Sequence, residues 1–209
     1  MEALLAFGAA LLALRLAGRL VALRRERADP QLVAWAAGLA AYAVASAALA
    51  WGAASGWSDP VFRVYYLFGG LLTAALLGVG SLLLNGRRWA APLGLVYTGL
   101  AVGVAIAVPL TTPVTGDSIP SAQEHLDFLP ARLLAVVGNS IGTIAVVAVA
   151  LLTIRRRPVG NALIVAGVAV AAAGSGLAGL GVAETAAFIA AAALLLYAGF
   201  VRTGVRRAS

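Results

Sequence analysis

The chain has 209 residues, of which 62% are hydrophobic and 11% are charged, and its formal net charge is +7. A soluble domain is ordinarily about half apolar and about a quarter charged, so the composition excludes a water-soluble protein and predicts the lipid bilayer as solvent. The basic residues are all arginines at or near the ends of apolar runs, which does not favour nucleic-acid binding. The absence of cysteine and the single histidine, His125, exclude thiol chemistry and histidine-rich metal or haem sites, and we expect no cofactor.

In chain order, the apolar runs predict an all-α, polytopic membrane protein built as a bundle of seven transmembrane helices. The segments between them are too short to fold alone, so we expect a single membrane domain, 1–209. One longer connection, 110–129, is predicted as an outer loop. The expected spans are 3–21, 31–52, 61–84, 89–109, 130–153, 158–179 and 182–201.

Charge asymmetry predicts the orientation of these spans. Arginines crowd the first, third and fifth connections and the C-terminal tail, whereas most acidic residues fall in the alternate connections. By the positive-inside rule the N-terminus is outside and the C-terminus inside. The arginines on the inner side are Arg24, Arg25, Arg27, Arg87, Arg88, Arg155, Arg156, Arg157, Arg202, Arg206 and Arg207.

The third span has one polar face made of small residues. It starts at Ser58-Asp59-Pro60, a capping residue followed by proline in the first turn. At ~100° per residue, nearly all its polar and small residues fall within an arc of roughly 140°. Small residues four apart allow a close approach of another helix, so we expect this face to point into the centre of the bundle. The face carries Arg63, Tyr66, Gly70, Thr73, Ala74, Gly78, Ser81 and Asn85.

The fifth span repeats this pattern, with Arg132, Asn139 and Thr143 on one face and Gly138 and Gly142 beside it. One hypothesis is that spans three and five line a polar cavity, open outward, in which the arginines attract a small anionic or polar solute. The alternative is that the arginines reach the outer headgroups or pair with acids such as Asp127. In that case the polar residues only join helices.

Two further charges are candidates for a pathway or ligand site. Arg15 is about twelve residues into the first span, or ~18 Å deep, where a charge is costly unless paired or hydrated. Tyr42 or Tyr97 on neighbouring spans could hydrogen-bond it, or a tilted helix could let it reach the headgroups. Glu184 opens the seventh span, either as a counter-ion or proton acceptor or as a first-turn acid favoured by the helix dipole.

Part of the third span resembles a family of uncharacterised multi-pass membrane proteins from GC-rich bacteria. The resemblance rests on 62–70 (FRVYYLFGG) and 77–84 (LGVGSLLL). It implies a location in the bacterial cytoplasmic (inner) membrane and no particular activity. The overall layout is also similar to the seven-helix sensor regions that precede bacterial histidine kinases.

Three classes of function follow from these observations. A small-solute or ion transporter or channel is favoured by the polar faces of spans three and five. A ligand-sensing or accessory subunit, acting through a membrane-protein partner or a homo-oligomer, is the alternative. An intramembrane enzyme is the least supported class, because no acid, histidine or lysine lies deep within a span. The outer-loop sequence Glu124-His125-x-Asp127 has no matching ligand cluster, so we expect no metal site.

Overall fold

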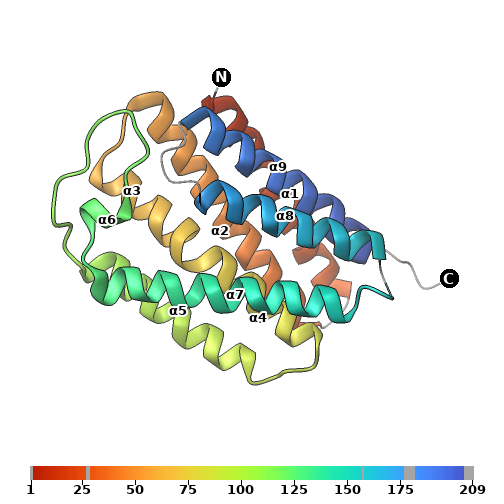
Figure 1. The fold of residues 1–209 in the computed structure, drawn as a ribbon. Coiled ribbons are helices and arrows are strands. Elements are labelled where there is room, and N and C mark those ends of the chain that lie inside the picture. Colours follow the sequence, from red (N-terminus) through yellow and green to blue (C-terminus); the bar gives the residue numbers. More distant parts are fainter. Residues whose placement is uncertain (1, 27–28, 157, 177–181, 205–209) are drawn as a thin grey trace.

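The computed structural model describes residues 2–26, 29–156, 158–176 and 182–204, and within them it contains helices and no strand (Figure 1). Five helical stretches are long and apolar enough to cross a membrane: Ala3–Glu26, Pro30–Ser55, Asp59–Leu84, Ala90–Ala107 and Phe128–Leu152. Two shorter apolar stretches follow, Pro158–Ala171 and Ala187–Gly199. The predicted all-helical fold with membrane-length helices is therefore confirmed for the described part of the chain.

The first two helices form a hairpin at one side of the bundle. Helix α1 (Glu2–Glu26) packs along α2 (Pro30–Ser55), which begins with proline in its first turn directly after Asp29. Helix α2 ends at Gly56, whose positive φ of 84° is a conformation that glycine adopts without strain. Because α2 also packs on α4, it lies between α1 and the middle of the bundle (Figure 1).

The third span is divided into three pieces by a change in helix type. It consists of α3 (Asp59–Tyr65), the π-helical segment η1 (Tyr66–Leu72) and α4 (Thr73–Leu84). The sequence predicts one continuous α-helix here, and this expectation is wrong for seven residues. A π-helix has a wider turn than an α-helix, so positions before and after η1 do not keep the ~100° spacing that an α-helix would give them.

The fourth and fifth spans are joined by a folded connection, which we call the outer segment because the sequence predicts it to lie outside the membrane. Helix α5 (Ala90–Ala107) lies at the edge of the bundle, and the chain then passes through the short helix α6 (Ala122–His125) into η2 (Phe128–Arg132) and α7 (Leu133–Leu152). The segment between α5 and η2 packs onto the neighbouring helix ends, since Val114 and Leu126 are buried. The Val114 N–H donates to the Asp59 carboxylate at 2.7 Å, which ties the loop to the start of α3.

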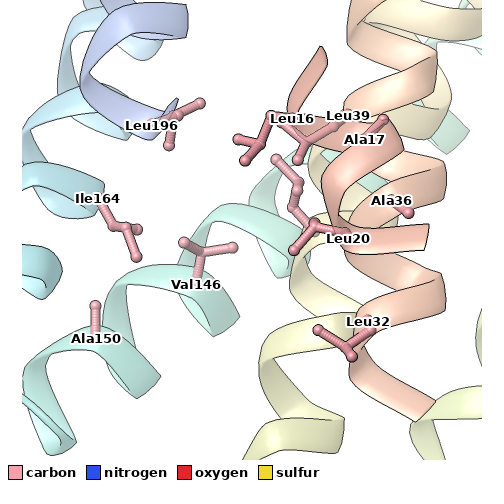
Figure 2. Packing of buried hydrophobic residues seen from close by; sticks show 11 residues of the cluster. Leu16, Ala17, Leu20, Leu32, Ala36, Leu39, Val146, Ala150, Ile164 and Leu196 are labelled. Carbon is pink, nitrogen blue, oxygen red and sulfur yellow. The ribbon is translucent and has the colours of Figure 1, made fainter. Parts of the chain in front are cut away.

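The last two helices close the bundle against the first. Helices α8 (Pro158–Gly176) and α9 (Val182–Gly204) lie side by side, and α9 also packs on α1 (Figure 1). A buried cluster joins these helices to the centre, with side chains from α1, α2, α4, α7, α8 and α9. Figure 2 draws the eleven buried residues of this cluster and labels ten of them: Leu16, Ala17, Leu20, Leu32, Ala36, Leu39, Val146, Ala150, Ile164 and Leu196.

Candidate functional site

Arg63 binds the end of a neighbouring helix. It is half-buried near the start of the third span, and its Nη1 donates to the carbonyl oxygens of Ala105 at 2.7 Å and Val108 at 2.9 Å. Ala105 lies in the last turn of α5 and Val108 is the capping residue that follows it. At this end a helix leaves its C=O groups without internal partners and carries partial negative charge. Arg63 therefore acts as a cap on α5.

Arg132 lies near the start of the fifth span, as the last residue of η2. It is half-buried, and its guanidinium carbon lies 5.6 Å from the centre of the Phe128 ring, within the range of a cation–π contact. Tyr66 links η1 to this segment, because its hydroxyl donates to the Ala131 carbonyl at 3.2 Å. The contacts that the structure gives these two arginines are thus with carbonyls and a ring.

A small recess lies beside Arg63, between spans three, four and five. Its volume is about 10 Å³, at the lower limit of the space that one buried water needs. Apart from Arg63 and Tyr66 its lining is apolar: Phe62, Val104, Ala105, Leu110, Leu126 and Ala131. The recess lies between spans three and five, where the sequence predicts a polar cavity. In this conformation it has no room for a solute larger than water.

The carbonyls of the π-helical segment accept hydrogen bonds from side chains of three helices. Thr73 Oγ1 in α4 donates to Phe68 O at 2.7 Å, and Asn139 Nδ2 in α7 donates to Gly70 O at 2.9 Å. The Tyr97 hydroxyl in α5 lies 2.9 Å from Leu71 O and 3.1 Å from Leu134 O. In lipid every backbone group needs a partner, so these side chains support the irregular helix.

Glycines allow α4 and α7 to touch backbone to backbone. A Cβ added at Gly78 would lie 2.6 Å from Gly142 Cα, and one added at Gly142 would collide with the carbonyl group of Ala74. On the same side of α7, a Cβ at Gly138 would collide with the Tyr97 hydroxyl. Four of the five small residues selected from the sequence therefore lie at close helix contacts. Gly70 differs, because a Cβ added there would lie 3.1 Å from the Tyr66 ring of its own segment.

Two of the remaining candidates, Arg15 and Thr143, make none of the contacts described so far. Arg15 is exposed on α1, and so is Arg19, whose guanidinium carbon lies 5.7 Å from the centre of the Tyr197 ring in α9. Tyr42, one candidate partner of Arg15, instead donates to the Ile189 carbonyl at 2.7 Å. Thr143 is half-buried on α7. The side chain of Glu184 lies outside the described residues.

The sequence indicates Tyr97 only as a possible partner of Arg15. In the structure its hydroxyl, on span four, lies close to carbonyls of spans three and five and so joins the three spans. A tyrosine in the middle of an apolar span was the available signal, because a buried hydroxyl needs a hydrogen-bond partner. In the outer segment, His125 Nδ1 lies 2.8 Å from Thr112 Oγ1. Among the described residues, no group of three metal-ligating side chains comes together.

No family model, curated protein or solved structure matches this chain. Its function is therefore argued from the geometry of its own residues. That geometry separates two kinds of polar group: those bonded within spans three to five, and Arg15, which is exposed on α1.

Proposed function

We propose that the protein crosses the bacterial cytoplasmic membrane seven times, with its N-terminus outside. The five membrane-length stretches support this, and α8 and α9, of 19 and 23 residues, are themselves long enough for two more crossings at ~1.5 Å per residue. The arginines between α4 and α5 and after α7 support the orientation.

The chain has no cysteine, so an introduced thiol reports its own position. Ser118→Cys, exposed in the outer segment, is expected to react in intact cells with a maleimide that cannot cross membranes. Asn85→Cys, exposed at the end of α4, is expected to react only after the membrane is opened. The reverse pattern would overturn the orientation.

We further propose that the protein is a ligand-sensing or accessory membrane subunit that acts through a partner. The observation that carries this proposal is the use of polar groups in spans three to five. Asn139, Thr73 and Arg63, which would face a solute in a transporter, are hydrogen-bonded to backbone carbonyls. The recess beside Arg63 holds about one water. Polar side chains used in this way join helices, as is common in membrane proteins.

A second candidate function, transport of a small solute or ion, is favoured by the π-helical segment η1. π-Helical turns occur frequently at functional sites, and interrupted helices in transporters offer backbone carbonyls to ions. The carbonyls of Phe68, Gly70 and Leu71 would take this role if Thr73, Asn139 and Tyr97 released them.

Thiol accessibility distinguishes the two functions. Thr143→Cys places a thiol of similar size at a half-buried position of α7, directly after Gly142, which contacts α4. In an accessory subunit this thiol is shielded, and it is expected to react far more slowly with a water-soluble maleimide than Ser118→Cys does. A water-filled pathway would expose it, so equal rates at 143 and 118 would support transport and overturn the accessory role.

A further inference from the structure

Helix α1 has one face buried in the bundle and one face open. Ala6, Ala9, Ala13, Leu16, Ala17 and Leu20 are buried, and α1 packs against α2 and α9. On the other side, large apolar side chains recur at intervals of three, four and seven residues and are exposed: Leu4, Phe7, Leu11, Leu14 and Val21. This spacing makes a continuous stripe along the helix. We call these five residues and Arg15 the outer face of α1, meaning the side of the helix that is turned away from the bundle.

Arg15 is the exception within this face. It is exposed near the middle of α1, and no hydrogen bond, ion pair or ring contact to it is found in the described part of the chain. The other arginines embedded in predicted spans have partners: Arg63 has two carbonyls, Arg132 the Phe128 ring and Arg19 the Tyr197 ring. A charged residue inside a membrane ordinarily faces protein or water and pairs with another group.

The chain itself cannot supply a carboxylate at the depth of Arg15. Its eight acidic residues all lie at helix ends or in connections: Glu2, Glu26, Asp29, Asp59, Asp117, Glu124, Asp127 and Glu184. On α1 the nearer acid in sequence, Glu26, is eleven residues from Arg15, or roughly 16 Å along the helix axis. An arginine side chain does not bridge that distance, so the counter-group belongs to another molecule.

We propose that the outer face of α1 binds a transmembrane helix of a partner protein that carries an aspartate or glutamate at the depth of Arg15. The apolar stripe supplies the packing surface, and the guanidinium supplies the specificity. A second copy of this chain fits less well, because α1 beside α1 in the same orientation brings Arg15 against Arg15 and no acid near either. This inference rests on the accessory role proposed above, and it names the chemistry of the partner.

The test uses the full-length chain in lipid vesicles and two synthetic transmembrane peptides. Both peptides are leucine–alanine helices, one with a single central glutamate and one with leucine at that position. A donor fluorophore on Ser118→Cys and an acceptor on the peptide report association by energy transfer. The glutamate peptide is expected to bind more tightly by roughly 5- to 30-fold, the range typical of strong polar contacts between model membrane helices.

Matched variants assign this preference to one residue. Arg15→Leu is expected to abolish it, whereas Arg19→Leu, which removes a neighbouring arginine that contacts Tyr197, is expected to keep it. Equal binding of the two peptides, or a preference that survives Arg15→Leu, would overturn the proposal.

Two other occupants of the face are tested in the same vesicles. If Arg15 serves an anionic headgroup, Arg15→Leu changes thermal stability only when phosphatidylglycerol is present, and neither peptide is preferred. If a second copy covers the face, Leu11→Cys forms a disulfide-linked dimer of the chain in high yield. Either result overturns the partner-helix proposal. Reactivity at Thr143→Cys is independent of this face, so failure here is distinguishable from failure of the accessory role.

Discussion

The third and first membrane helices each contain an arginine, and the two arginines differ in burial and in hydrogen bonding. Arg63, near the start of the third span, is half-buried and donates to two carbonyls at the end of α5. Arg15, near the middle of α1, is exposed and faces away from the bundle. The same residue type therefore completes the internal structure in one place and offers an unused charge in the other. This contrast separates structural polar groups from a candidate contact for another molecule.

The packing also differs between the third helix, which contacts a neighbour closely, and the open side of α1. Helix α4 meets α7 through glycines, so that backbone touches backbone at Gly78 and Gly142. On α1, a Cβ added at Gly18 would find nothing within 4 Å. Membrane helices gain little from the hydrophobic effect and associate through close packing and hydrogen bonds. We infer that the contact of α4 with α7 determines the stability of the bundle and that the outer face of α1 does not.

Gly142→Ala is expected to have the largest effect on stability. The new methyl group would collide with the carbonyl group of Ala74, and backbone cannot move aside as a flexible side chain can. Overpacking of this kind costs about 1–3 kcal/mol, and the absence of a flexible neighbour places this site at the upper end. The measurement is unfolding of the purified protein in mild detergent, followed by circular dichroism.

The matched control is Gly103→Ala in α5, where the added methyl group meets nothing within 4 Å. There the substitution is expected to be neutral or stabilising by up to about 1 kcal/mol, because alanine favours a helix over glycine. A similar loss of stability in both variants would show that the α4–α7 contact has no special role.

Arg63→Leu is expected to cause a smaller loss of stability. It leaves the carbonyls of Ala105 and Val108 without their donor, and an unsatisfied buried polar group costs about 1–3 kcal/mol. Because Arg63 is only half-buried, water can replace part of the contact, which places the effect at the lower end. Arg88→Leu, exposed in the turn before α5, is the control and is expected to leave the unfolding transition unchanged.

The sequence contains the information for the broad features of the fold. The apolar runs predict the membrane-length helices, and Ser58-Asp59-Pro60 marks the residue at which α3 begins. The π-helix could not be predicted, because a helical wheel assumes one rise and one rotation per residue throughout. The hydrogen-bond acceptors of Asn139 and Tyr97 could not be predicted either, since they are backbone carbonyls and every residue has one.

The exposure of Arg15 was unpredictable for a related reason. The depth of a residue in a span follows from its position in the sequence, but the direction in which it points depends on which helices surround it. Here α2 and α9 cover the alanine-rich side of α1, and Arg15 falls on the other side. A prediction of depth could therefore select Arg15 as unusual without showing whether its partner lies inside the chain.

Arg15→Leu is expected to have the smallest effect on the isolated protein. In lipid nanodiscs the thermal midpoint should stay constant or rise slightly, because an unpaired charge is exchanged for a side chain that lipid solvates well. Arg19→Leu should lower it slightly, since it loses a cation–π contact with Tyr197 worth about 0.5–1 kcal/mol. If Arg15→Leu destabilises the protein as much as Arg63→Leu, then Arg15 has a partner within the chain and is a structural group like Arg63. An unchanged midpoint leaves Arg15 as a charge that the chain retains without using it for its own stability, as a binding face for another helix requires.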